Sequence, residues 1–66
     1  MNVSKLRGKI VECGKTQKEV AEYLKISENA LSSKMNGRTT FLVTEANMIS
    51  EFLGLTNQEK IEIFLD

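Results

Sequence analysis

Apolar residues recur at helical spacing along most of the chain, and short polar segments separate the recurrences. The first run consists of Val3, Leu6, Ile10 and Cys13, at intervals of three or four residues, and Gly14 comes directly after it. This spacing predicts a helix over about residues 3–13, with Gly14 as its left-handed C-terminal stop. It also places the Cys13 thiol in the core, as a buried group rather than a reactive one.

The next segment, residues 16–37, has the pattern of two short helices joined by a tight turn. Thr16 and Glu19 stand three residues apart, so each side chain can accept a hydrogen bond from the main-chain amide of the other residue. This capping box predicts where the first helix begins, and Ser27 is a good N-cap for the second. The expected buried side of the two helices consists of Val20, Ala21, Leu24, Ala30, Leu31 and Met35.

The second helix of this pair carries a face of small polar side chains. When Leu31 and Met35 point to the core, no bulky apolar residue interrupts the other side of the helix. Such a face suits contacts to the edges of DNA bases. Its residues are Glu28, Asn29, Ser32, Ser33 and Asn36.

Two further helices are predicted in the rest of the chain. Thr44 is expected to cap the fourth helix, which ends at Gly54. Thr56 and Glu59 form a second capping box, which begins a short fifth helix. The expected apolar stripe of the fifth helix is Ile61, Phe64 and Leu65, and Ile63 lies off that stripe.

Length and composition favour a single small all-α domain. The 66 residues suffice for one core, so no second, ligand-sensing or catalytic domain is expected. Proline, alternating apolar segments and internal repeats are absent from the sequence. No apolar run reaches the length of a membrane span and no secretory signal is visible, so we expect a soluble cytoplasmic protein. The single cysteine fits a reducing compartment.

The net charge of zero conceals an uneven distribution of charge. Residues 1–40 carry eight basic and four acidic side chains, a net charge of +4, whereas residues 41–66 carry one basic and five acidic side chains, a net charge of −4. A basic half that contains the two-helix segment suits a protein that presents one side to phosphates. Chance segregation of surface charge is the alternative interpretation.

The chain lacks the side chains that catalysis and metal binding need. It has no histidine, one cysteine and a single aspartate at its C-terminus. No nucleophile is therefore paired with a base, and no set of metal ligands is present. The four glycines are scattered and form no phosphate-binding loop. We expect no enzymatic activity, cofactor, metal or small-molecule ligand.

These residues resemble the Cro and phage-repressor helix-turn-helix proteins, also called the xenobiotic-response-element family. The family pattern is Gln, three residues, Ala, a turn, a hydrophobic residue and Ser, then a buried aliphatic, and it is similar to Gln17, Ala21, Ile26-Ser27 and Leu31. The later segment KMNGRTTFLVTEANMISEFLGL resembles a branch common in low-GC Gram-positive bacteria and their phages. The resemblance implies a compact five-helix, lambda-repressor-like DNA-binding domain over residues 1–66, with the helix-turn-helix formed by the second and third helices.

Two positions depart from the family pattern. Lys25 stands where the turn normally carries glycine, so a left-handed conformation there would cost roughly 1 kcal/mol. Lys34 stands where the family often buries an aliphatic residue. Its methylenes can lie along the edge of the core while the ammonium reaches toward a phosphate.

The resemblance also implies which residues contact DNA. The recognition helix is residues 28–36, and residues near its N-terminus enter the major groove deepest. Glu28 and Asn29 are therefore expected to contact base edges first, and Ser33 and Ser32 one turn later; simple capping or solvation of the first turn is the alternative for Glu28 and Asn29. The residues expected to bind phosphates are Lys9, Lys15, Thr16, Gln17, Lys34, Asn36, Arg38 and Thr39.

Together these features predict a sequence-specific DNA-binding transcriptional regulator, a Cro-like repressor of a phage or prophage. One domain covers half of an operator, so we expect a homodimer, at least on DNA, at a pseudo-palindromic site. The acidic C-terminal half, around Ile63, is the expected dimer surface. One alternative is a protein-interaction module of the same fold, an antirepressor that binds another repressor, which the zero net charge and the pI near 6.2 favour. An antitoxin of a toxin pair is the other.

Overall fold

Residues 1–65, which the computed structural model describes, form five α-helices and no strand. The helices are α1 (Val3–Glu12), α2 (Gln17–Leu24), α3 (Glu28–Met35), α4 (Val43–Leu53) and α5 (Asn57–Phe64). For this part of the chain, the predicted all-α class and the number of helices are confirmed. None of these helices combines the length and the apolar character that crossing a membrane requires.

Capping residues begin three of the helices as predicted. The Thr16 hydroxyl accepts from the Glu19 amide at 3.1 Å, and the Glu19 carboxylate accepts from the Thr16 amide at 3.0 Å. Thr56 and Glu59 repeat this capping box at the start of α5, with the same two distances. The Ser27 hydroxyl accepts from the Ala30 amide at 3.0 Å and so caps α3.

The fourth helix begins earlier than predicted, because Leu42 and not Thr44 is its N-cap residue. Leucine has no side-chain acceptor, but Glu45 stands three residues later, and its carboxylate accepts from the Leu42 amide at 2.8 Å. The acidic partner of a capping box is therefore sufficient here without the hydroxyl partner. Leu42 and Val43 therefore belong to the start of α4. Both residues are exposed.

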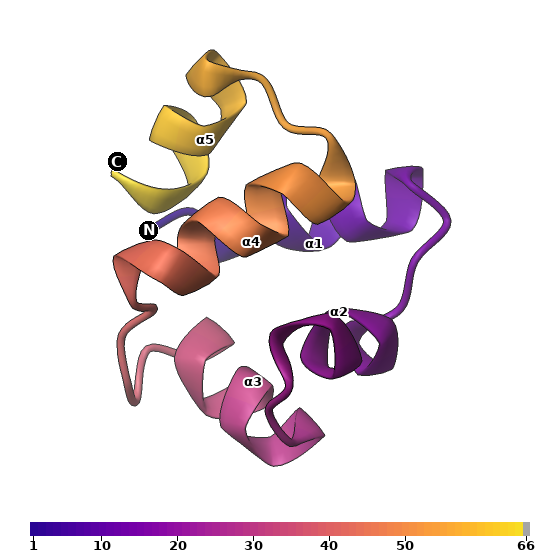
Figure 1. The fold of residues 1–66 in the computed structure, drawn as a ribbon. Helices are drawn as coiled ribbons and strands as arrows, with labels where there is room; N and C mark the ends of the chain where they lie inside the picture. Colours follow the sequence, from indigo (N-terminus) through magenta and orange to yellow (C-terminus); the bar gives the residue numbers. More distant parts are fainter. Residues whose placement is uncertain (66) are drawn as a thin grey trace.

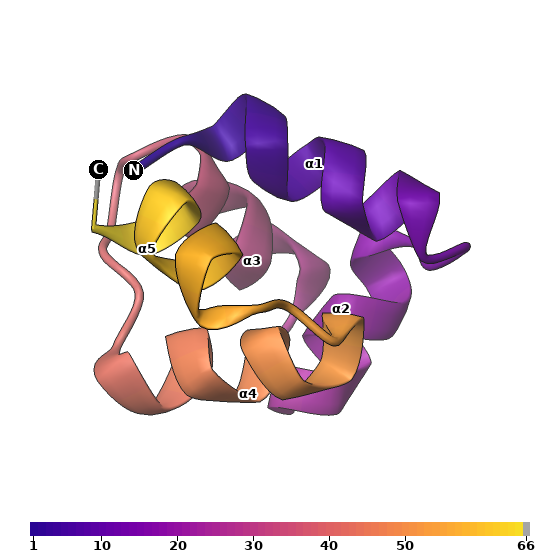
Figure 2. The ribbon, with the colours of Figure 1, turned by 90° about the horizontal axis from the view of Figure 1, so that it is seen from above.

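The helices pack in two groups that α4 connects. α2 packs against α3 and α4, and α5 packs against α1 and α4. In Figure 1, α3 and α5 accordingly lie at opposite edges of the molecule, with α4 between them. The two ends of the described chain lie close together in both views (Figures 1 and 2), and the Asn2 amide donates to the Ile63 carbonyl at 2.8 Å.

One apolar core joins all five helices. Leu31 and Met35 anchor α3 in it, and both side chains are buried. Burial of this apolar surface is the main source of stability in a domain of this size. The core residues are Leu6, Ile10, Val20, Ala21, Leu24, Leu31, Met35, Ile49, Leu53 and Ile63.

The predicted stripe of α5 is wrong, because Ile63 is fully buried while Ile61 and Leu65 are exposed. Glu59 and Lys60 precede Ile63 by four and three residues, so they lie on the same face of the helix. Their charged ends bind Lys9 of α1 and Asn47 of α4. The charged residues thus belong to the packed face, and Ile63 cannot contribute to a dimer surface.

Cys13 lies at the edge of the core rather than inside it. It follows α1 as the C-cap residue, is half-buried, and packs against the core cluster. Its thiol donates to the Leu53 carbonyl at 3.3 Å, which links α1 to the end of α4. Gly14 then adopts a φ of +70°, the left-handed stop that the sequence predicts.

Candidate nucleic-acid interface

A three-residue connection between α2 and α3 sets the position of α3. Lys25 adopts the left-handed conformation, with φ 60° and ψ 39°, which reverses the chain at the end of α2. The Ile26 amide donates to the Ala21 carbonyl at 3.0 Å, and the half-buried Ile26 side chain packs against the core. Ser27 then caps α3. Hydrogen bonds and apolar packing therefore hold both ends of this connection.

The outward face of α3 carries the small polar side chains of Asn29, Ser33 and Asn36, with the half-buried Ala30 beside them. With Leu31 and Met35 buried, a rotation of 100° per residue turns Asn29, Ser33 and Asn36 away from the core. The helix itself lies at the edge of the molecule opposite α5 (Figure 1). It is therefore free of the helices that pack on the other side of the domain.

The residues predicted to contact bases differ in exposure. Glu28 and Asn29, in the first turn of α3, are exposed, whereas Ser32 and Ser33 are half-buried. The Asn36 side-chain amide donates to the Ser32 hydroxyl at 3.4 Å, which occupies part of the hydrogen-bonding capacity of that serine. Asn29 is exposed and also lies on the outward side of the helix, opposite Leu31 and Met35.

The turn after α3 brings Arg38 and Thr39 back to the end of that helix. Gly37 has a φ of +80°, and the Arg38 amide donates to the Ser33 carbonyl at 2.9 Å. The side chains of Arg38 and Thr39 are exposed, as is that of Asn36, the C-cap residue of α3. Three of the predicted phosphate-binding residues are thus brought together at one end of α3.

The predicted residues near the start of α2 are not equally available. Gln17, its first residue, is exposed. The hydroxyl and amide of Thr16 both bind Glu19, so their role in the cap is structural. Lys15 is half-buried, with its ammonium 5.1 Å from the centre of the Phe52 ring, a distance at which the ring attracts the cation.

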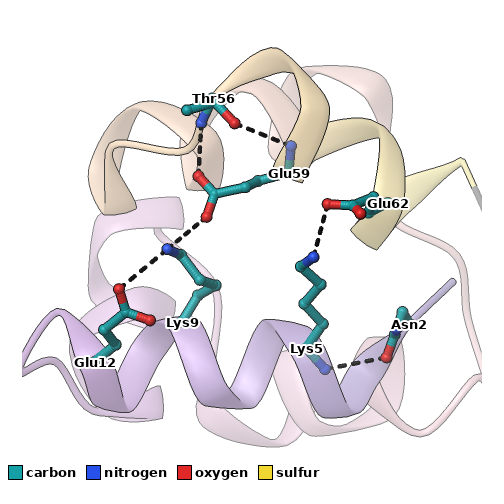
Figure 3. A network of polar contacts seen from close by, with 7 residues as sticks. All are labelled: Asn2, Lys5, Lys9, Glu12, Thr56, Glu59 and Glu62. Atoms are coloured by element: carbon teal, nitrogen blue, oxygen red, sulfur yellow. Dashed lines mark hydrogen bonds and ion pairs between the residues drawn. The ribbon is translucent and has the colours of Figure 1, made fainter.

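Two of the predicted phosphate-binding lysines are engaged with carboxylates. Lys34 lies 3.2 Å from Glu45 and donates to the Thr40 carbonyl, so its ammonium connects the end of α3 to the start of α4. Lys9 points toward α5, where it lies 2.6 Å from Glu59 (Figure 3). The structure therefore does not bring Lys9 to the α3 edge of the molecule.

Ion pairs connect the basic half of the sequence to the acidic half. Lys5, Lys9 and Lys34 of the basic half pair with Glu62, Glu59 and Glu45 of the acidic half. The fold thus neutralises part of each excess internally. Within residues 1–65, the lysine and arginine side chains that have no ion pair are Arg7, Lys15, Lys18, Lys25, Arg38 and Lys60.

Two exposed cations near the candidate interface were not predicted as site residues. Lys18 lies in the first turn of α2, and Lys25 occupies the connection that leads into α3. In the sequence, only their positions could have indicated this role: Lys18 directly follows Gln17, and Lys25 stands two residues before Ser27.

No three His, Cys, Asp or Glu side chains of the described residues are arranged to hold a metal ion.

Comparison with known proteins assigns the whole chain to one family. The family is described as "Protein of unknown function (DUF739)", and it matches residues 1–66. No curated protein and no solved structure matches the chain. A functional conclusion must therefore come from the residues described above.

Proposed function

Because this chain belongs to DUF739, a family of unknown function, we propose its activity from its own residues: sequence-specific binding of double-stranded DNA as a Cro-like transcriptional regulator. In this proposal α2 and α3 form a helix-turn-helix within a lambda-repressor-like domain, and α3 enters the major groove. The protein acts as a repressor of a phage or prophage operator. DNA is its ligand, and no chemical reaction is involved.

The outward face of α3 is the observation that carries the proposal. A core anchored by Leu31 and Met35 holds a helix whose solvent side offers Asn29, Ser33 and Asn36. Asparagine can donate to and accept from adenine at once, and each good bidentate contact discriminates by about 1–3 kcal/mol. A capped, core-packed helix also holds these groups in a fixed direction, which base recognition requires.

Phosphate contacts are assigned to the exposed groups on either side of α3. Gln17 and the N-terminal amides of α2 bind one phosphate, and Arg38, Thr39 and Asn36 bind another. Lys25 joins this set because it is exposed and has no ion pair within residues 1–65. Lys9 is left out, since its ammonium faces Glu59 on α5.

A selection of bound sequences from a random DNA library tests the proposal directly. We expect an enriched inverted repeat, since two copies are needed to cover a full operator, with half-sites about one helical turn apart. The affinity for the selected site should fall steeply as salt rises, because phosphate contacts release counterions. An absence of any enriched motif would contradict specific DNA binding.

The Asn29→Ala variant tests the role of α3. We expect its affinity for the selected site to fall about 10-fold or more, with a relaxed preference at one base pair, because a base contact is lost. Gln58→Ala is the matched control: Gln58 is also an exposed amide at the second position of a helix, but on α5. Fluorescence anisotropy with matched and mutated sites measures both variants, and equal behaviour of the two would contradict the assignment.

A protein-interaction module of the same fold is the second candidate, and the internal charge pairing favours it. Lys5, Lys9 and Lys34 are engaged with glutamates, and the net charge is zero. Fewer free cations mean weaker attraction to a polyanion. Weak binding to all DNA sequences alike, without an enriched motif, is the result that this candidate predicts.

A further inference from the structure

Exposed apolar side chains gather where α4 begins and α5 ends. The apolar patch comprises Leu42 (61% exposed), Val43 (78%), Ile61 (51%) and Leu65 (78%). These two helix ends lie on the same side of the molecule in Figure 1. Scattered single apolar residues are ordinary on a protein surface, but a contiguous group of this kind marks an interaction site.

The patch contains hollows as well as projecting side chains. One groove, of about 480 Å³, is lined by Val43, Ile61 and Leu65, and an adjoining one, of about 270 Å³, by Leu42, Val43 and Leu65. Ala46 and Phe64 line both grooves. A small molecule could fill a groove but would leave the projecting side chains in water. A protein surface with its own projections and hollows covers both.

We propose that a second copy of this chain occupies the apolar patch, in a symmetric dimer. A two-fold interface brings the same surface of both copies together, so it requires projections and hollows in one patch, and this patch has both. Among the described residues, none of the four patch side chains is charged, and the charged residues that line the two grooves are Lys60 and Lys34. A mainly apolar centre with few charged residues is typical of such interfaces.

The choice of a second copy also rests on the proposed function. A single α3 covers one half-site, so an operator-binding protein of this size needs a symmetric partner. The smaller groove reaches Lys34 at the end of α3 and Thr39 in the turn after it, but Asn29, Ser33 and Asn36 line neither groove. Two copies joined through the patch therefore keep both α3 faces available to one DNA duplex.

One ion pair connects the patch to α3. The Glu45 carboxylate accepts from the Leu42 amide at 2.8 Å and lies 3.2 Å from the Lys34 ammonium. Lys34 and Glu45 are both largely buried, with side chains 15% and 13% exposed. Docking at Leu42 and Val43 thus fixes the position of α3 through a short chain of contacts, and with it the spacing between the two copies of α3.

The size of the patch predicts a weak dimer. A standard interface buries about 800 Å² on each partner, which is roughly a fifth of the 4238 Å² surface of this small chain, whereas the patch has four exposed apolar side chains. Association is therefore expected above roughly 10 μM in the absence of DNA. On DNA, the neighbouring half-site raises the effective concentration of the second copy.

Sedimentation equilibrium over about 1 μM to 1 mM protein, without DNA, tests the proposal. We expect the wild type to pass from monomer to dimer, and Val43→Asp and Leu65→Lys to stay monomeric or to associate at least 10-fold more weakly. Both variants should keep the fold, because an acidic residue suits a helix start and a basic residue suits a helix end; circular dichroism checks this. Val11→Lys, at a similarly exposed valine (76%) in the last turn of α1, where a basic residue also suits the helix end, is the matched control and should dimerise like the wild type.

Concentration-dependent amide chemical shifts provide the second measurement, expected at residues 42–47 and 57–65. A wild type that stays monomeric to 1 mM, or patch variants that associate as it does, would overturn the proposal. The outcome is separate from that of the DNA selection, since neither measurement contains DNA. A dimer that selects no DNA motif would contradict the proposed function alone, and a monomer that selects one would contradict this interface alone.

Discussion

At the scale of single residues, Lys25 is the residue whose backbone conformation suits its type least, because it is left-handed. It is the one non-glycine residue with a positive φ among residues 1–65, and it is exposed. In a left-handed conformation the Cβ atom crowds the following carbonyl, at a cost of roughly 1–2 kcal/mol. The packing of Ile26 and the Ser27 cap hold the residue there, so the surrounding contacts offset the strain.

Replacement of Lys25 by glycine should therefore stabilise the domain. We expect Lys25→Gly to raise the free energy of unfolding by about 0.5–1 kcal/mol, since the relief of strain exceeds the added entropy of the unfolded chain. Urea denaturation followed by circular dichroism measures the change. Lys25→Ala removes the same charge but keeps the Cβ atom, so it should give no gain. An equal gain in both variants would assign the effect to charge instead.

At the scale of elements, α3 depends on its cap and on its tertiary contacts. It has eight residues, and helices of this length are marginal in water by themselves. Two of its side chains, Leu31 and Met35, are buried in the core, and the Ser27 hydroxyl satisfies one of its free amides. The helix proposed to contact DNA is thus held by few interactions, each of which has a measurable effect.

Loss of the Ser27 cap should destabilise the domain measurably. We expect Ser27→Ala to lower the free energy of unfolding by about 1 kcal/mol, because the Ala30 amide loses its acceptor. Thermal or urea denaturation provides the value. Ser27→Asp restores an acceptor at the same position and should recover most of the loss. An aspartate variant as unstable as the alanine variant would show that capping is not the cause.

At the scale of the whole molecule, ion pairs join the two ends of the chain. Lys5 and Lys9 of α1 bind Glu62 and Glu59 of α5, and Glu59 also accepts from the Thr56 amide (Figure 3). The hydrogen bond from Lys9, followed by that from Thr56, lowers the pKa of Glu59 to about 2. The same contact raises the pKa of Lys9 above its usual 10.5.

Acid should weaken this connection in a defined pH range. The folded state holds the Glu59 pKa at about 2, below the ordinary value of 4.5, so its contribution to stability is present above pH 4.5 and is lost as pH falls toward 2. We expect the stability difference between the wild type and Glu59→Gln to shrink over this range. Denaturation at a series of pH values measures it.

A double-mutant cycle with Lys9→Gln identifies the partner. Because the hydrogen bond from Lys9 is the largest cause of the lowered pKa, Glu59→Gln should have a smaller pH-dependent effect in the Lys9→Gln background. An unchanged effect in that background would assign the dependence to other contacts of Glu59. The raised Lys9 pKa predicts a second loss of stability in strong alkali, as pH rises through the pKa of the folded state.

The sequence by itself determined the local structure of this protein. Capping residues and their partners are three positions apart, so Thr16, Ser27 and Thr56 mark helix starts without any knowledge of the fold. Helical periodicity likewise predicted the five helices and the burial of Leu31 and Met35. It missed the start of α4, because there the cap consists of Glu45 and the Leu42 amide alone.

Only the tertiary structure decided the features that arise from contacts between residues far apart in the chain. Ile63 is buried because α5 packs this face against α1 and α4, where Glu59 and Lys60 also find their partners, and periodicity within eight residues contains no information on these neighbours. The ion pairs between the two halves and the apolar patch at the ends of α4 and α5 arise in the same way. Both need contacts between distant helices, which packing determines and local spacing does not.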